Sequence, residues 1–357
     1  MNDVTRIAVV GAGHAAGQLV ASLRQGGYDG DIAVFGDEPH RPYQRPPLSK
    51  AVLKGDLDPT RTLLKPESWY DTQRIDVHLE ARVASVAPAT GQLTLTDGTA
   101  HHYDRLVLAT GARPLELPVD GADLDSVFLM RTLDHAMALK GAARPGAHAV
   151  IVGGGYIGLE AAASLRALGL EVTVVERESR VLERVTSPFI SQFFTSLHAA
   201  HGVEVLTDAE VTRIDGDEHV CGVTLADGRT LAADIVLVGI GIVPNVALAT
   251  AAGIDCDNGI VVDRDAQTSA PGVYAIGDCT QRELVHYDRR ARLESVHNAL
   301  EQAKLAAAHI LEQDRPVEDC PWFWSEQFDV KLQIAGLSDG YDQTVIRGAP
   351  DERRFAM

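Results

Sequence analysis

Two glycine-rich segments combine residue types and spacing that suit the binding of a dinucleotide. The first, RIAVVGAGHAAG over residues 6–17, places Gly11, Gly13 and Ala16 in a GxGxxA spacing. In such a motif the first glycine permits a tight turn, the second lets the backbone approach a pyrophosphate, and the third small residue lets a helix pack on a strand. One copy alone is weak evidence, because glycine-rich turns between a strand and a helix also occur for packing reasons.

The second segment, HAVIVGGGYIGLEAAASLRALGLEVTVVERE, repeats the whole pattern with Gly153, Gly155 and Gly158. The pyrophosphate of each ligand would lie at a helix N-terminus, where unpaired N–H groups point at it. Two complete fingerprints predict two dinucleotides. The economical pairing is a tightly held flavin dinucleotide, FAD, with an exchangeable nicotinamide dinucleotide, since a hydride can pass from one ring to the other.

An acidic residue follows the second strand of each fingerprint. Asp37 and Glu38 close DIAVFGDE, and a carboxylate there can accept both ribose hydroxyls. Glu176 takes the equivalent place in the second copy, where it would accept a hydrogen bond from a free 2′-OH and repel a 2′-phosphate. This favours NADH over NADPH, although the adjacent Arg177 weakens the preference.

The sequence around these residues predicts strands and helices in alternation. An apolar strand over Ile7–Val10 precedes a helical pattern, and the buried strands of RLVLATGARP (105–114) and DIVLVGIGIVPN (234–245) end in glycine turns. We interpret these two as the points between which the nicotinamide domain is inserted into a discontinuous flavin domain. The strand in APGVYAIGDCTQ delivers Asp278, either to the ribityl chain of a flavin or as an ordinary strand end capped by Asp.

Composition and charge exclude several classes of partner. The 357 residues carry a net charge of −18, which would repel nucleic acid or an anionic membrane surface. No apolar run would span a bilayer, and the N-terminus enters a strand pattern with no secretory signal, so we expect a cytoplasmic protein. Cys221, Cys256, Cys279 and Cys320 lie far apart, which argues against a disulfide scaffold, a metal site or a local redox disulfide. We expect each to be a small buried residue.

The combined motifs resemble the FAD-dependent, NADH-dependent ferredoxin reductases of bacterial oxygenase systems, of the putidaredoxin reductase type, to which the apoptosis-inducing factor is related. The segments that carry this resemblance are GDEPHRPYQRPPLSK (36–50), LATGARP, IVGGGYIGLEAAASLR, GIGIVPN, YAIGDC, LESVHNALEQAK (293–304) and PWFWSEQFDVKLQIAGLS (321–338). The resemblance implies an α/β fold with two Rossmann-like domains in the glutathione-reductase-like architecture, plus a C-terminal α+β domain. The predicted divisions are 1–113 and 242–318 for the FAD-binding domain, 114–241 for the NAD-binding domain and 319–357 for the C-terminal domain.

In this family the proline-rich loop lies along the FAD, so Arg45 would face the pyrophosphate and Lys50 would approach the flavin edge near N5. Prolines fix the backbone, and a cation stabilises a reduced, anionic flavin. Lys50 should not sit unpaired in a partly buried site, and Glu160 is its expected partner, placed also to contact the nicotinamide amide. The alternative is a proline-rich turn with solvated charges. The resemblance implies further cofactor contacts at Ala15, Val83, Ala109, Thr110, Gly111, Arg131, Tyr156, Ile157, Arg184 and Gly241.

The C-terminal part offers two more cofactor contacts by resemblance. Trp322 and Trp324 alternate as on a strand, and Trp324 would lie against the flavin ring, although a core role for both is also plausible. The helix that begins in LESVHNALEQAK would aim its N-terminal amides at the flavin O2 and N1 region, with Val296 at the first turn. His297 is interpreted as structural or lining, because hydride transfer needs no general base.

The redox partner is predicted from charge. Two-iron ferredoxins are acidic, so an acidic reductase needs a local cationic surface, and Arg289, Arg290 and Arg292 immediately precede the flavin helix. The alternative is a solvated loop. Strands are expected in FDVKLQIAG and DQTVIRG, and we expect the C-terminal sheet to be truncated where the chain stops at RRFAM.

Three alternatives share most of these motifs. A rubredoxin reductase would differ only in its acceptor. An NADH oxidase would carry a reactive cysteine, and Gln44 inside the loop counts mildly against it. A redox-responsive binding protein of the apoptosis-inducing-factor type would carry a long C-terminal insertion, which this chain lacks.

Overall fold

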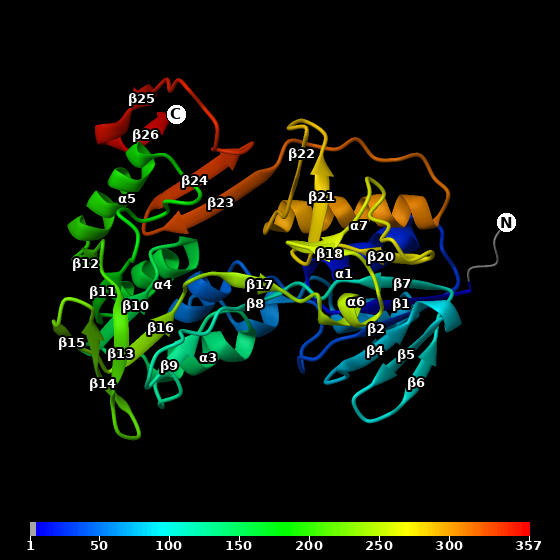
Figure 1. Ribbon diagram of the computed structural model, residues 1–357, viewed down its shortest axis with the longest axis horizontal. Coiled ribbons are helices and arrows are strands. Elements are labelled where there is room, and N and C mark those ends of the chain that lie inside the picture. Colours follow the sequence, from blue (N-terminus) through cyan, green and yellow to red (C-terminus); the bar gives the residue numbers. More distant parts are fainter. Residues whose placement is uncertain (1–4) are drawn as a thin grey trace. The chain divides into compact units, whose positions relative to one another are not determined.

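The computed structural model describes residues 5–357, which form two compact units (Figure 1). The first four residues lie outside this range. The expectation that the N-terminus carries no secretory signal therefore falls partly on residues that the structure does not describe. Unit 1 consists of the chain up to Arg45 together with Pro59–Arg113 and Ile242–Phe323, whereas unit 2 consists of Pro46–Asp58, Pro114–Gly241 and Trp324–Met357. Residues 46–58 and 324–357 therefore group with unit 2 by compactness. The domain boundaries drawn from the sequence stay a prediction.

Unit 1 is built on a five-stranded parallel sheet with the order β20-β7-β1-β2-β3. Its strands are β1 (Arg6–Val10), β2 (Asp31–Phe35), β3 (Ile75–His78), β7 (Arg105–Leu108) and β20 (Val273–Ala275). Side chains alternate along β1, so that Ile7 and Val9 face one layer while Ala8 and Val10 face the other. The expected strand over Ile7–Val10 is confirmed.

Two helices cover one face of this sheet. They are α1 (His14–Gln25) and α7 (Val296–Ile310), which pack side by side, blue and orange in Figure 1. The other face packs against an antiparallel sheet of β4 (Val83–Ala87), β5 (Gln92–Leu95) and β6 (Ala100–His102), with α6 (Ala247–Ala251) against β4. The first fingerprint therefore lies where β1 meets α1, at the edge formed by the carboxyl ends of the strands.

Unit 2 repeats the arrangement with a sheet of order β12-β11-β10-β16-β9. Its strands are β9 (Val127–Leu129), β10 (His148–Val152), β11 (Glu171–Val175), β12 (Val203–Leu206) and β16 (Ile235–Val238). Helices α3 (Leu133–Ala142), α4 (Tyr156–Ala167) and α5 (Pro188–Ala200) pack on it, and the other face meets β13 (Val211–Gly216), β14 (Val220–Leu225) and β15 (Thr230–Ala232). Both predicted Rossmann-like folds are confirmed.

The remaining elements are short. They are α2 (Glu67–Thr72), the paired strands β8 (Ala112–Pro114) and β17 (Ile242–Pro244), the sheet of β18 (Cys256–Asp257), β19 (Gly259–Val261), β21 (Thr280–Leu284) and β22 (Arg289–Ala291), and the pairs β23 (Trp322–Gln327) with β24 (Val330–Ala335) and β25 (Arg347–Ala349) with β26 (Arg354–Ala356). The strand expected in DQTVIRG is wrong for residues 342–346, which are exposed and irregular; pairing begins only at Arg347.

The prediction that all four cysteines are buried is wrong for two of them. Cys279 is buried and Cys256 half-buried, but Cys221 and Cys320 are exposed. Cys221 lies on β14 between Val220 and Gly222, where a β-bulge shifts the register with β13 and leaves this side chain exposed, and Cys320 lies in the irregular segment before β23. No helix within residues 5–357 is long and apolar enough to cross a membrane, and the same range holds no cluster of ligating side chains that could bind a metal ion.

Candidate functional site

The first fingerprint has one glycine that the fold requires and one that leaves open space. Gly11 has φ +107°, and a Cβ added there would lie 2.2 Å from the carbonyl oxygen of Ala109. At Gly13 an added Cβ would meet no atom within 4 Å. Gly13 also begins α1 without any side-chain cap, so the first N–H groups of the helix have no side-chain acceptor there. This cradle fits a pyrophosphate.

The proline-rich loop folds back onto the carboxylate that follows β2. The Tyr43 hydroxyl donates to Glu38 Oε2 at 2.5 Å, and the Arg45 guanidinium donates to Glu38 Oε1 at 2.6 Å and to the Tyr43 hydroxyl at 2.9 Å. Burial alone would lower the pKa of Arg45, but its interactions with Tyr43, Glu38 and Asp278 raise it. Arg45, Glu38 and Asp278 thus share one electrostatic site in unit 1, whereas Asp37 is exposed.

The loops after β7 and β20 are held by polar side chains, of which the sequence analysis missed Asn245 and Gln302. The Asn245 side chain donates to the Thr110 carbonyl at 2.9 Å, and Thr110 Oγ1 donates to the Asn245 carbonyl at 2.7 Å. Gln302 Oε1 accepts from Gly277 N and Thr280 Oγ1, both at 2.8 Å, which fixes the turn that carries Asp278. The available sign in the sequence was that Gln302 lies at helical spacing from the apolar residues Ala299, Leu305 and Ala306, and a buried amide is normally hydrogen-bonded.

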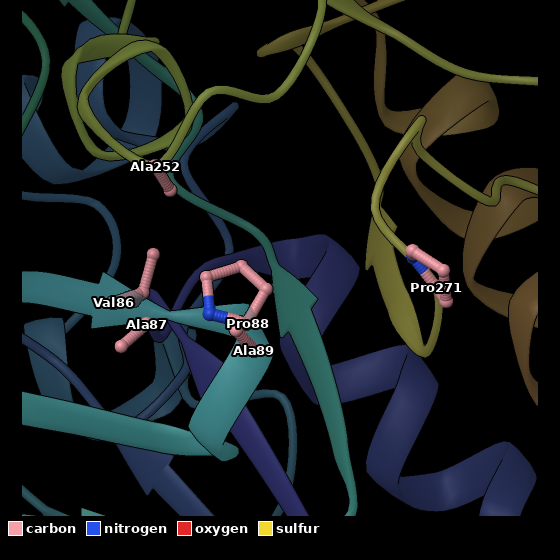
Figure 2. Close-up of a pocket in the computed structure, with 6 residues that line it drawn as sticks. All are labelled: Val86, Ala87, Pro88, Ala89, Ala252 and Pro271. Carbon is pink, nitrogen blue, oxygen red and sulfur yellow. The ribbon is translucent and has the colours of Figure 1, made fainter.

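The other predicted contacts of unit 1 lie around this edge. Ala15 and Ala16 are buried in α1, and an added Cβ at Gly277 would lie 3.2 Å from the Ala15 methyl. Val83 begins β4 and is 7% exposed, and Val296 begins α7 after its cap, Ser295. Figure 2 shows a separate pocket of the same unit, lined by the small apolar residues Val86, Ala87, Pro88, Ala89, Ala252 and Pro271. Its lining has no titratable side chain, so it adds nothing to the site.

The second fingerprint in unit 2 repeats the pattern of the first. Gly153 has φ +109°, and an added Cβ there would lie 2.5 Å from the Gly239 carbonyl oxygen. An added Cβ at Gly158 would lie 2.1 Å from the Gly153 carbonyl oxygen, whereas one at Gly155 would meet no atom within 4 Å. Gly155 also begins α4 without a side-chain cap. This unit therefore also fits a dinucleotide.

Glu176 is held by the fingerprint itself. Its Oε2 accepts from Gly154 N at 2.6 Å, and its Oε1 accepts from Glu178 N at 2.8 Å. The neighbouring Arg177 is 72% exposed and pairs with Glu178 at 3.0 Å. The carboxylate is thus fixed at the carboxyl end of β11, and the cation that weakened the preference for NADH is paired with another acid.

Other predicted nicotinamide-side contacts surround the same unit. Tyr156 and Ile157 form the first turn of α4, where burial, followed by the charge of Glu160, raises the pKa of Tyr156 while Ile157 stays 43% exposed. Arg184 is exposed, and one of its terminal nitrogens would lie 3.5 Å from a Cβ added at Gly241. Arg131 follows β9 and is half-buried.

A buried ion pair joins the proline-rich segment to α4. Lys50 Nζ lies 2.7 Å from Glu160 Oε2, with side chains that are 15% and 4% exposed. Lys50 lies in a π-helical turn, Leu48–Val52, and its own backbone departs from helical geometry at φ −121° and ψ −107°. The predicted pairing of Lys50 with Glu160 is confirmed. The sequence analysis did not identify Ser49, whose hydroxyl also donates to Glu160 Oε2, at 2.7 Å.

The predicted docking arginines divide into two kinds. Arg289 and Arg290 are exposed on β22. The Arg292 side chain is only 13% exposed and is engaged by Glu294 and by Asn258, so it differs from the solvent-facing cation that the sequence suggested. Trp322 and Trp324 lie on β23, as expected, and both are half-buried. The roles of all these residues stay predictions.

The chain matches two family models and is similar over nearly its full length to known reductases. Residues 5–303 match the family model described as pyridine nucleotide-disulphide oxidoreductase, and residues 322–357 match one described as reductase C-terminal. The chain is 46% identical to a probable ferredoxin reductase of Castellaniella defragrans, over 100% of this chain and 88% of that protein. It is 37% identical to a rubredoxin-NAD(+) reductase of Pseudomonas putida, over 95% and 89% respectively.

Among solved structures, the covalent putidaredoxin reductase–putidaredoxin complex matches with a TM-score of 0.96 at 39% identity, covering 98% of this chain and 86% of that one. The two fingerprints fit the FAD and the NAD(P)H that this family binds. The resemblance deduced from the sequence is confirmed. The chain belongs to the pyridine nucleotide-disulphide oxidoreductase family, and it is an oxidoreductase of the ferredoxin reductase type.

Proposed function

We propose that this protein takes a hydride from NADH onto bound FAD and passes the electrons singly to a two-iron ferredoxin that serves a bacterial monooxygenase or dioxygenase. The observation that carries this proposal is the pair of fingerprints, each with open space at its middle glycine, in a chain similar over its full length to a ferredoxin reductase. FAD supplies a ring that accepts two electrons with the hydride and releases them one at a time.

The preference for NADH rests on Glu176. Its carboxylate is fixed by two backbone N–H groups and keeps lone pairs for ribose hydroxyls. A 2′-phosphate in the same place would meet this negative charge at close range, which is costly. Arg177, the nearest cation in sequence, points its charge at Glu178. We therefore propose that the protein discriminates strongly against NADPH.

Lys50 and Glu160 are the proposed catalytic pair. Lys50 would stabilise negative charge on the reduced flavin, since a preorganised cation in a partly buried position acts strongly on developing charge. Glu160 holds the ammonium group in place and would orient the nicotinamide amide. Arg45 and Asp278 would bind the pyrophosphate and ribityl regions of FAD, and Trp324 would pack against its ring.

The ferredoxin surface is proposed to include Arg289 and Arg290. They are exposed on a chain of net charge −18, so they supply local positive charge that an acidic ferredoxin needs. We also propose that the protein works in the cytoplasm, where NADH is available. A rubredoxin as acceptor is the second candidate, because a rubredoxin reductase of Pseudomonas putida is 37% identical to this chain.

The test is an anaerobic titration of the purified yellow protein, first with NADH and in a parallel sample with NADPH. The flavin absorption should bleach at near-stoichiometric NADH and far less readily with NADPH. Glu176→Ala should bring the two coenzymes closer together, while Glu204→Ala, which removes an exposed acid of the neighbouring strand β12, should keep the preference. A colourless protein, or one that NADH leaves yellow, would refute the hydride step. Equal bleaching by both coenzymes would refute the role of Glu176.

A further inference from the structure

A buried chain of side chains reaches Glu160 from the C-terminal strand β23. The Ser325 hydroxyl donates to Glu160 Oε1 at 2.8 Å, and Gln327 Nε2 donates to Ser325 Oγ at 3.2 Å. His198 Nε2, on α5, lies 2.8 Å from Gln327 Oε1. Ser325, Gln327 and His198 are each 0% exposed. All four residues belong to unit 2.

Every hydrogen bond in this chain points toward the carboxylate. An amide oxygen only accepts, so Nε2 of His198 carries the hydrogen that it shares with Gln327. Burial lowers the pKa of His198, which keeps the ring neutral with a single N–H at neutral pH. His198 therefore donates to Gln327, Gln327 donates to Ser325, and Ser325 donates to Glu160. Bonds aligned in this way polarise one another and favour negative charge at the end that only accepts.

The two oxygens of Glu160 are thus held from different parts of the chain. Oε2 accepts from Lys50 Nζ and Ser49 Oγ, both at 2.7 Å, whereas Oε1 accepts from the Ser325 hydroxyl at 2.8 Å and, at 3.4 Å, from the backbone N–H of Glu326. Ser164, one helical turn after Glu160, donates to the Ser49 carbonyl at 2.7 Å and so fastens the turn that carries Lys50. Rotation of the carboxylate about its last bond would break contacts on both sides.

Ser325 and Gln327 lie on the same strand as Trp324, the predicted contact of the flavin ring. Successive side chains of a strand point to opposite faces, so Ser325 and Gln327 share one face of β23 while Trp324 lies on the other. The strand that would bring Trp324 to the flavin ring is therefore the strand that anchors Glu160. Within the described residues, Nδ1 of His198 has no hydrogen-bond partner, so this buried polar run carries a cost that apolar side chains filling the same space would avoid.

We propose that Ser325 and Gln327 are positioning residues for the hydride step: they fix the Glu160 carboxylate so that Lys50 is held in its working place, with His198 as the far end of the chain. This inference rests on the proposed function in assigning the Lys50–Glu160 pair to hydride transfer. It gives the C-terminal segment a part in the reaction with NADH, in addition to any part in binding the acceptor.

The test compares three variants of the FAD-loaded protein. Ser325→Ala removes the hydroxyl that contacts Glu160, and Gln327→Leu removes the second bond while keeping the first. Ser338→Ala is the matched control, because the Ser338 hydroxyl donates to the Val185 carbonyl on the surface and has no link to Glu160. Thermal unfolding midpoints establish that each variant is folded. If Ser325→Ala does not fold, Gln327→Leu alone is compared with Ser338→Ala.

Two readouts are made on each variant. The first is the rate at which a limiting amine-acetylating reagent modifies Lys50, measured by peptide mass spectrometry with the exposed Lys54 as internal reference. The second is the rate constant for anaerobic bleaching by saturating NADH. Losing one bond to a charged group predicts Lys50 labelling that is faster, and bleaching that is slower, by roughly tenfold in Ser325→Ala. Gln327→Leu should show smaller changes of the same sign, and Ser338→Ala none.

The outcomes separate this inference from the proposed function. If NADH fails to bleach even the unaltered protein, the hydride function is wrong, and the labelling of Lys50 still decides whether β23 positions the pair. If Ser325→Ala and Gln327→Leu match Ser338→Ala in both readouts, the positioning role is overturned while the hydride function stands.

Discussion

Replacing Glu160 by glutamine should destabilise the protein far more than its small change in shape suggests. The carboxylate accepts on both oxygens, from Lys50 and Ser49 at Oε2 and from Ser325 at Oε1. An amide has one acceptor oxygen, so in either orientation its NH₂ group faces a group that can only donate, the Lys50 ammonium on one side or the Glu326 backbone N–H on the other. A buried donor left without its bond costs about 1–3 kcal/mol, and a broken buried ion pair about 3–5 kcal/mol. Since Lys50 retains 15% exposure and can regain some water, we expect a loss of about 3 kcal/mol.

The assay is urea unfolding followed by circular dichroism, with Glu326→Gln as the matched control. Glu326 also pairs with a lysine, Lys331, at 3.3 Å, but both side chains are about half exposed. The control should lose no more than about 0.5 kcal/mol. Adding Lys50→Met to Glu160→Gln should recover part of the loss, because the unpaired ammonium is removed. Equal midpoints for Glu160→Gln and Glu326→Gln would refute the claim that this buried pair is tightly coupled.

Three further predictions follow from the same structure. Gly155→Ala should weaken NADH binding by roughly tenfold or more in a titration, because the added methyl projects into open space where a pyrophosphate would lie, while the melting temperature and FAD content stay unchanged. Gly158→Ala should instead destabilise the fold, and the reverse pattern would contradict this assignment. Burial lowers the pKa of His198 below its usual 6.5, so the unfolding free energy should stay constant above pH 6.5 and fall as the pH drops toward the lowered pKa. His198→Asn should flatten this pH dependence in urea titrations at several pH values, and an unchanged pH dependence in the variant would contradict the assignment to His198. Arg290→Ala should slow ferredoxin reduction most at low salt and leave anaerobic bleaching by NADH unchanged, so an effect on bleaching would exclude a docking role.

Local sequence patterns predicted the scaffold well because a few positions permit few alternatives. Gly11 and Gly153 lie at positive φ in close contact with a neighbouring strand end, so their spacing from an apolar run nearly dictates a strand, a tight turn and a helix. The Lys50–Glu160 pair was predictable for a different reason, since the resemblance to the reductase family placed Lys50 in a partly buried site, where a lysine needs an acidic partner.

The rest could not be predicted because it depends on contacts between distant segments. Ser325 and His198 carry no local pattern, and their link to Glu160 depends on how distant segments of unit 2 pack together. Cys221 shows the limit of residue averages: cysteines are usually buried, but this one is the exposed residue at a β-bulge in an otherwise mostly buried strand. Arg292 likewise shares a sequence cluster with Arg289 and Arg290 but is engaged by Glu294.

The central claim, that two electrons enter with a hydride and leave one at a time, is tested most directly by counting electrons. The protein is mixed anaerobically with a limiting amount of NADH and an excess of oxidised two-iron ferredoxin, and reduced ferredoxin is counted by electron paramagnetic resonance. The account predicts two ferredoxins reduced for each NADH consumed, with oxidised flavin restored at the end. Flavin that stays bleached beside oxidised ferredoxin would contradict it, and rapid re-oxidation by a rubredoxin in the same experiment would transfer the function to the second candidate.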